Sequence, residues 1–297
     1  MDPLESSNTM GARTQREFED LLKHDRAVVV GALVLVIAIS WLYLLAGAGT
    51  GMSAFEMSSL STAIWASGGS SMGLPMTGAM GHAMAAMATP ADWTWAYAFV
   101  MFGMWWVMMI AMMLPSAAPM ILLFALVNRR SHAKGGPYVP TAVFAGAYLA
   151  AWGGFSVAVV ALHWGLERAE LLSPMMASRN ATFGGALLVL AGAYQLSPLK
   201  HACLRHCRAP IDFISRQWRA GRRGAFRMGV LHGLYCLGCC WALMALLFFG
   251  GVMNLYWTAG LALFVLLEKT IPPGHWLASL SGLGLVGWGV ALLTAVA

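Results

Sequence analysis

The segment from residue 231 to 244, LHGLYCLGCCWALM, places three cysteines and a histidine in an otherwise apolar run. On an α-helix with about 100° between successive residues, His232, Cys236, Cys239 and Cys240 share one face. Thiolates and imidazoles are ligands of soft and borderline metal ions. We therefore expect His232, Cys236 and either Cys239 or Cys240 to bind one ion between this helix and a neighbour. Alternatively, the cysteines serve as small residues for close helix packing.

A second group of sulfur and nitrogen side chains lies just before this run, in LKHACLRHCRAP. Cys203 and Cys207 are four residues apart and so face the same way on a helical turn. His206 or His201 would complete a soft site with them. The spacing does not match a zinc finger or ribbon. The alternative is a basic turn at the membrane surface, where lysine and arginine side chains meet phospholipid headgroups.

Methionines form the third group, and 14 of the 21 lie between Met52 and Met120. Thioethers select Cu(I), whereas magnesium and calcium prefer oxygen ligands. A weak thioether collector outside and thiols inside would suit the passage of a soft cation, although buried methionines also fill gaps between helices. The candidate ligands are Met80, Met84 and His82 in a glycine- and alanine-rich loop, and Met108, Met109, Met112 and Met113 in an apolar run.

The composition indicates an integral membrane protein. Of 297 residues, 59% are hydrophobic and 10% are charged, unlike the usual soluble domain. Several runs reach the roughly 20 apolar residues that a helix needs to cross a bilayer. We predict an all-α, polytopic transmembrane helix bundle of about seven spans, the second of which Pro115 and Pro119 should kink or break. The spans are residues 27–46, 95–127, 139–166, 181–196, 228–251, 255–267 and 276–296.

Basic residues predict the orientation, because lysine and arginine are retained on the cytoplasmic side. With the N-terminus inside and the C-terminus outside, 16 of the 18 fall in inner segments, and only Arg168 and Arg179 lie outside. This predicts a multi-pass membrane protein with its N-terminus inside. The basic stretch 216–227 is then expected beside anionic lipid, and no nucleic acid is expected as a partner. The cysteines face the reducing side, so structural disulfides are not expected.

The predicted regions are a polar cytoplasmic leader (1–26), a first transmembrane anchor (27–46), a Met- and Gly-rich outer loop (47–94) and a membrane domain (95–297) with a basic cytoplasmic loop (198–227). Within the membrane domain, Glu268 and Lys269 end the sixth predicted span in VLLEKTIPPG. Adjacent charges at the inner interface either pair or extend toward water, and we expect them to pair.

Four motifs occur in an order that resembles a known bacterial family. They are WWVMMIAMMLPSAAPM, YQLSPLKHACLRHCRAP, GLYCLGCCWALMALLFFGGVMNLYW and LLEKTIPPG. The family is catalogued as predicted metal-binding integral membrane proteins, and some members are labelled copper chaperones. The resemblance covers residues 95–274 and implies an inner-membrane protein of several spans. It also implies ligands at Cys203, Cys207, Cys236, Cys239, Cys240 and at Met108, Met109, Met112 and Met113, with His201 and His232 beside these motifs.

The first functional hypothesis is a membrane protein that binds a soft metal, with Cu(I) favoured, for transport, chaperoning or delivery to a copper enzyme. Its partners would be the metal ion, the lipid bilayer and a copper-enzyme client or periplasmic metal donor, and no enzymatic activity is expected. If the methionines only pack, zinc suits the thiols and imidazoles equally well. The alternatives are a thiol–disulfide oxidoreductase using Cys236 and Cys239 or Cys203 and Cys207, a structural subunit of a membrane complex, and haem ligation by His163 and His232.

Overall fold

The computed structural model describes residues 26–48, 58, 92–172, 176–178, 180–271 and 274–295. The predicted leader and most of the predicted outer loop, with Met80, Met84 and His82, lie outside the described residues. Within them the regular secondary structure is helical, apart from one isolated β-bridge between Leu172 and Ser178. The helices are Arg26–Leu45, α4 (Trp95–Ala133), α5 (Thr141–Arg168), α6 (Ala181–Gln195), α7 (Pro198–Arg208), α8 (Pro210–Gln217), α9 (Gly221–Ala245), α10 (Leu247–Gly250), α11 (Leu255–Thr270) and α12 (Gly274–Thr294).

The all-helical prediction is confirmed for the described residues, but the count of seven spans is not. In the described part of the chain, five helices are long and apolar enough to cross a membrane, and a sixth candidate is the pair α6 and α7, which is bent by 62°. The predicted sixth span forms α11, whose 16 residues fall short of a full crossing. The predicted basic loop 198–227 contains α7, α8 and the first turns of α9.

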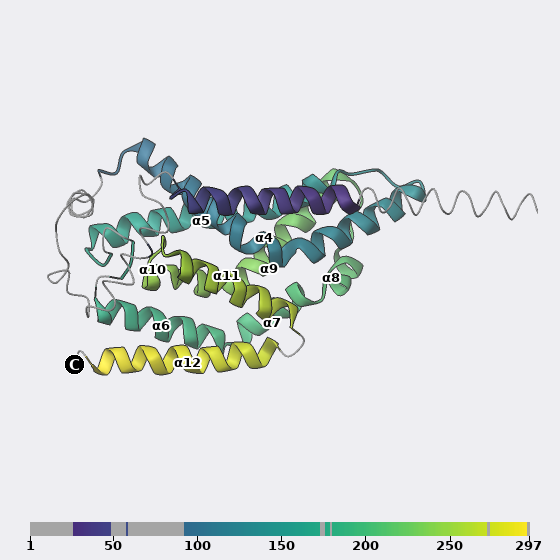
Figure 1. The fold of residues 1–297 in the computed structure, drawn as a ribbon. Coiled ribbons are helices and arrows are strands. Elements are labelled where there is room, and N and C mark those ends of the chain that lie inside the picture. Colours follow the sequence, from purple (N-terminus) through teal and green to yellow (C-terminus); the bar gives the residue numbers. More distant parts are fainter. Residues whose placement is uncertain are drawn as a thin grey trace, which may run out of the picture.

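Helix α4 runs for 39 residues and continues through Pro115 and Pro119. The two prolines therefore do not break it, and Figure 1 shows α4 changing direction between its ends, as expected of a helix that contains proline. Beside the prolines, Met113 O accepts hydrogen bonds from Ser116 Oγ (2.9 Å) and Tyr148 Oη (3.3 Å). These bonds join α5 to the middle of α4.

Glycines let two pairs of helices approach closely. A Cβ atom on Gly229 of α9 would lie 2.3 Å from Phe144 O, and one on Gly233 would lie 2.6 Å from Ala151 Cβ. From Gly229 to Gly233 on α9, the contact moves from Phe144 to Ala151 on α5, so the two helices run parallel. Small residues at such positions are typical of helix interfaces in membranes.

Helices α6 and α12 pack antiparallel in the same manner, side by side in Figure 1. A Cβ atom on Gly192 would lie 2.7 Å from Gly282 O, and one on Gly289 would lie 2.7 Å from Gly185 O. Each helix thus places two glycines, seven residues apart, against the backbone of the other.

The bend between α6 and α7 sends α7 against α9 and α11. Ser197 caps α7 by accepting a hydrogen bond from Lys200 N, and Pro198 occupies the first turn, where its missing N–H costs nothing. The bend therefore has a local cause in the sequence Leu196–Ser197–Pro198. It places the two cysteines of α7 beside the three of α9.

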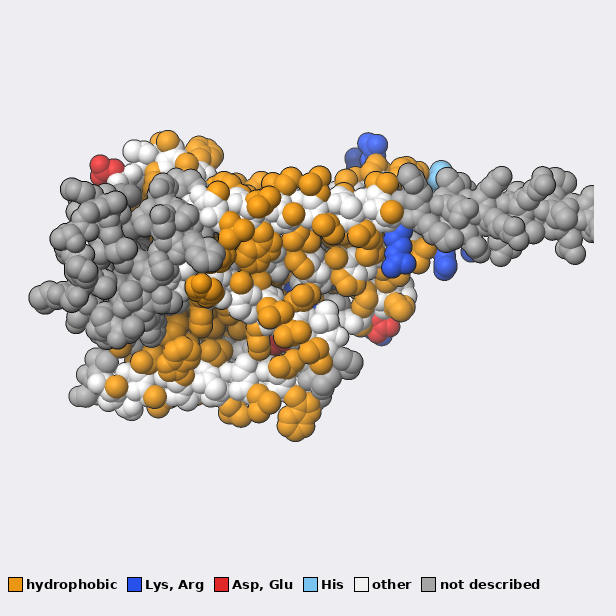
Figure 2. All heavy atoms as spheres, viewed as in Figure 1, with side chains coloured by type: hydrophobic (Ala, Val, Ile, Leu, Met, Phe, Trp, Pro, Cys, Tyr) orange, Lys and Arg blue, Asp and Glu red, His pale blue; other side chains and the backbone are white. Residues whose placement is uncertain are grey.

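The side chains that face outward are largely apolar. Figure 2 shows hydrophobic side chains over most of the visible helical surface and lysine and arginine side chains at the end where α4 terminates. Exposed leucines and tryptophans such as Leu190, Leu263, Trp276 and Leu283 belong to this surface. Such a surface suits contact with lipid, and the predicted sidedness stays a prediction.

We predict that Gly229→Ala destabilises the protein, whereas Gly154→Ala does not. The added methyl group would meet a backbone carbonyl oxygen at position 229, and it would meet nothing within 4 Å at position 154. Overpacking of this kind costs about 1–3 kcal/mol, while alanine itself favours a helix by about 1 kcal/mol over glycine. Thermal unfolding of both variants in detergent measures the difference. Equal melting temperatures for the two would contradict the close α5–α9 contact.

Candidate functional site

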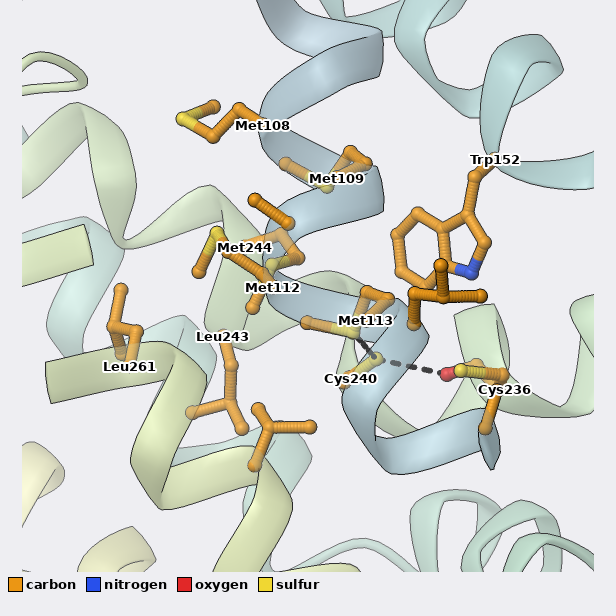
Figure 3. Close-up of a cluster of buried hydrophobic side chains, with 14 of the residues drawn as sticks. Met108, Met109, Met112, Met113, Trp152, Cys236, Cys240, Leu243, Met244 and Leu261 are labelled. Carbon is orange, nitrogen blue, oxygen red and sulfur yellow. Dashed lines mark hydrogen bonds between the residues drawn. The ribbon is translucent and has the colours of Figure 1, made fainter. Parts of the chain in front are cut away.

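The buried thiol of Cys240 lies between α9 and α4. Its Sγ atom is 3.7 Å from Met113 Sδ, and it also donates a hydrogen bond of 2.8 Å to Cys236 O one turn earlier. Figure 3 shows Met113 and Cys240 pointing toward each other, with Cys236 beside them. All three residues are at most 1% exposed. A thiol and a thioether from two helices are thus brought together in an apolar interior.

Cys239 turns to a different helix. Its Sγ atom lies 3.9 Å from Cys207 Sγ of α7 and donates to Cys236 O at 3.0 Å. Neighbouring residues on a helix point about 100° apart, so Cys239 and Cys240 face α7 and α4 respectively. Cys239 and Cys240 therefore form two interhelical sulfur pairs, one with α7 and one with α4.

Cys236 lies between the two pairs. Lys269 Nζ of α11 is 2.9 Å from Cys236 Sγ, and Tyr148 Oη of α5 is 3.1 Å from it. The thiols of Cys207, Cys239 and Cys240 all lie close enough to interact with the Cys236 sulfur. We call Cys207, Cys236, Cys239, Cys240 and Met113 the sulfur cluster.

The predicted pairing of Glu268 with Lys269 is wrong. Glu268 binds Lys200 of α7, with Nζ 2.7 Å from Oε1 and 2.9 Å from Oε2, and both side chains are fully buried. Gln195 accepts a second hydrogen bond from Lys200 and donates one to Ser281 Oγ at 2.9 Å. Because consecutive helical residues point in different directions, Glu268 faces α7 while Lys269 faces the sulfur cluster.

Cys203 is half-buried and lies at the edge of the sulfur cluster. A Cβ atom on Gly238 would be 2.8 Å from Cys203 Sγ, so the glycine leaves the room that this thiol occupies against α9. Tyr194 Oη donates to the carbonyl oxygen of the same glycine. The motif Cys236–Leu237–Gly238–Cys239 thus supplies two thiols, and its glycine leaves space for a third thiol, that of Cys203.

The histidines do not join the thiols. His232 lies among aromatic rings, 5.4 Å from that of Phe213 and 5.8 Å from that of Tyr148, and its Nδ1 has no hydrogen-bond partner among the described residues. His206 is exposed, donates a hydrogen bond from Nδ1 to Ala202 O at 2.9 Å, and stacks on Tyr235 with ring centroids 4.2 Å apart. In the described part of the chain, the half-buried His201 shows no side-chain contact with the cysteines.

The haem hypothesis is also wrong. His232 of α9 lies against Tyr148 of α5. His163 is also on α5, fifteen residues after Tyr148, and its Nε2 atom is 3.2 Å from Glu167 Oε1. At 1.5 Å per residue, this separation is roughly 22 Å. The two imidazoles are too far apart to bind one iron from opposite faces.

The predicted methionine ligands of the apolar run are all buried on α4. Met108, Met109 and Met112 are at most 1% exposed and lie along the helix before Met113, as Figure 3 shows. Among these four, only Met113 has a described contact with a thiol. Met80, Met84 and His82 lie outside the described residues, so their predicted role as a collector stays a prediction.

Within the described ranges, no three histidine, cysteine, aspartate or glutamate side chains are arranged around one point as a metal ion would require. The thiols interact with one another, but they spread toward two helices. A zinc site, which takes four such ligands or three and a water, is therefore not shown. The two sulfur pairs offer lower coordination numbers, with a thioether included in one of them.

Three polar residues beside the sulfur cluster were not anticipated from the sequence. They are Lys269, Tyr148 and Ser116, whose Oγ atom lies 3.2 Å from Lys269 Nζ. Each belongs to a helix other than α9, so spacing along one run gives no sign of them. A lysine inside an apolar run is nevertheless a signal, because a buried ammonium needs a partner.

These features define a class, an all-helical protein whose apolar helices enclose a cluster of thiols and a thioether. A family described as PpoB2, copper chaperone, matches residues 102–292, and the chain belongs to this family. The matched range includes the whole sulfur cluster. It confirms the resemblance drawn from the four motifs. No curated protein and no solved structure matches the chain.

We predict that thiol-specific alkylation under reducing conditions modifies Cys203 before the other four cysteines. Cys203 and Cys207 are both half-buried, whereas Cys236, Cys239 and Cys240 are buried, and the Cys207 thiol is in contact with Cys239. Mass spectrometry after short exposure of the folded protein would locate the modified residue. Denatured protein, which should react at all five positions, is the control. Early modification of Cys240 would contradict the described burial.

We predict that Glu268→Gln destabilises the protein strongly and that the double variant Glu268→Leu with Lys200→Met recovers most of the loss. Removing one partner leaves the Lys200 ammonium buried without its countercharge, at a cost of about 3–5 kcal/mol. Apolar replacement of both partners removes that cost. Thermal unfolding in detergent distinguishes the two variants. Equal destabilisation of both would show that the pair holds α7 to α11 by more than charge compensation.

Proposed function

We propose that this protein is a copper chaperone of the bacterial inner membrane that binds Cu(I) in the sulfur cluster and passes it to a partner. The Cys240–Met113 pair carries the proposal, because it joins a thiol and a thioether from two helices in a water-poor interior. Soft sulfur ligands select Cu(I) over hard cations. The copper-chaperone description of the family supports the same ion.

The sulfur–sulfur distances suit a shared ion. Two of three sulfur atoms bound to one metal at about 2.3 Å in a trigonal arrangement lie about 4.0 Å apart. The two interhelical pairs measure 3.7 Å for Cys240–Met113 and 3.9 Å for Cys239–Cys207. Each pair can therefore take an ion with little movement of its helices. Cys236 lies between them as a ligand available to either pair.

The order of the ligands suits transfer from one pair to the next. The buried methionines of α4 lead to Cys240, and Cys239 leads to Cys207 and to the half-buried Cys203 on α7. At the two interhelical pairs, an ion would pass between sulfur atoms that are already in contact. The direction and the final acceptor, a copper enzyme or another metal carrier, depend on the difference in affinity between donor and acceptor.

The Cys239–Cys207 contact also favours a second function, thiol–disulfide exchange. The redox pair would join α7 and α9, unlike the predicted Cys236–Cys239 pair, because the Cys239 thiol is directed to Cys207. A disulfide needs a sulfur–sulfur distance of about 2.05 Å, so the two helices would have to move together. Oxidation without metal binding would distinguish this function from the first.

We predict about one Cu(I) per chain in protein purified anaerobically in detergent, lost in the triple variant Cys236→Ser, Cys239→Ser and Cys240→Ser, which removes a thiol from both pairs. Met113→Leu keeps the shape of the side chain but removes the thioether, and we expect about a tenfold weaker Cu(I) affinity, the effect of about 1.4 kcal/mol. Competition with a chromogenic Cu(I) chelator and elemental analysis measure both quantities.

The matched control is Met228→Leu, a buried methionine of α9 outside the sulfur cluster, which should bind copper like the wild type. Folded wild-type protein without copper would refute the chaperone proposal. If such protein instead formed a Cys207–Cys239 disulfide on mild oxidation, thiol–disulfide exchange would replace it.

A further inference from the structure

The ammonium group of Lys269 has its neighbours in the sulfur cluster. Lys269 is 9% exposed, and its Nζ atom contacts Cys236 Sγ at 2.9 Å and Ser116 Oγ at 3.2 Å. Glu268, the adjacent acid, is bound to Lys200. Among the described residues no carboxylate pairs with Lys269. The groups that can carry a negative charge beside it are therefore the thiols.

A buried charge is costly unless an opposite charge lies beside it. In this interior the total charge of the ligands, the lysine and the bound ion consequently decides which ion is stable. A thiol that binds a metal does so as a thiolate and releases its proton to solvent. With Cys236 and Cys240 as thiolates and Met113 neutral, the ligands carry two negative charges, and Lys269 contributes one positive charge.

We infer that Lys269 determines the charge of the ion that the sulfur cluster accepts and makes the site specific for monovalent soft cations. This inference rests on the proposed copper function. Cu(I) or Ag(I), two thiolates and one ammonium sum to zero. A divalent ion such as Zn(II) or Cd(II) leaves one uncompensated positive charge in the same apolar surroundings.

The location of Lys269 favours this role over one of general stabilisation. Its Nζ atom contacts Cys236, whose sulfur lies between the two pairs, and Ser116, three residues from Met113 on α4. The second buried lysine in this region is Lys200 of α7. It has a carboxylate partner, Glu268, and so its charge is balanced. Softness alone would admit Cd(II), which is soft and divalent, whereas charge compensation at a site of two thiolates disfavours it.

The wild-type protein provides the first test. Anaerobic binding of Cu(I), Ag(I), Cd(II) and Zn(II) to the full-length protein in detergent, followed by competition with chelators, gives the affinity for each ion. We expect Ag(I) to bind at least about 100-fold more tightly than Cd(II), since an uncompensated buried charge is costly. Equal affinities for Ag(I) and Cd(II) would overturn the inference without any variant.

The second test changes the charge of the lysine. Lys269→Met should reduce the Ag(I)-to-Cd(II) affinity ratio by about 100-fold, whereas Lys269→Arg should keep it within about tenfold of the wild type. Lys134→Met, at the exposed end of α4, is the matched control and should leave the ratio unchanged. Melting temperatures show whether each variant is folded.

The outcomes separate this inference from the copper proposal. A wild type that binds no Cu(I) refutes the proposed function. A wild type that binds Cu(I), combined with a folded Lys269→Met variant of unchanged ion preference, refutes only the role of Lys269. A Lys269→Met variant that does not fold leaves the decision to the wild-type Ag(I)-to-Cd(II) comparison.

Discussion

Two lysines buried between apolar helices, Lys200 and Lys269, constrain how α7, α9 and α11 fit together. An ammonium group in such surroundings has to lie beside a negative or strongly polar group. Lys200 finds Glu268 and Gln195, which joins α7 to α11 and to the end of α6. Lys269 finds Cys236 and Ser116, which joins α11 to α9 and α4. Adjacent residues of one helix thereby tie it to different neighbours.

Close helix packing supplies the other half of this arrangement. Gly229 and Gly233 bring α9 so near to α5 that Tyr148 reaches Cys236, and Gly238 leaves room for the Cys203 thiol. The 62° bend between α6 and α7 then turns Cys207 toward Cys239. Larger residues at the glycine positions would separate the helices by more than the short reach of a cysteine side chain. The sulfur cluster is thus a consequence of small residues on α9 and of a bend caused by Ser197 and Pro198.

The sequence predicted the helices well, because apolar runs of near-membrane length leave little choice of secondary structure. It also predicted that Cys236, Cys239 and Cys240 share a face and that Cys203 and Cys207 face the same way on a helical turn, but it placed the two groups in separate sites. It did not predict that Cys239 and Cys240 point to different helices, since that depends on where α4 and α7 lie around α9. Lys269 was assigned to Glu268 for the same reason. Periodicity along one helix fixes a face, whereas the partners of that face depend on the register between helices.

The count of spans shows the limit of hydropathy in another way. Residues 255–267 are apolar enough to suggest a crossing, yet α11 has only 16 residues and ends at the buried pair Glu268 and Lys269. In contact with lipid, these two charged side chains would lose hydration without gaining a partner, which is unfavourable. Because α11 is enclosed by α4, α7 and α9, Glu268 instead binds Lys200 and Lys269 contacts Cys236. The charged end of α11 therefore belongs to the interior of the bundle. Its place there, rather than its hydrophobicity, brings an ammonium group to the sulfur cluster.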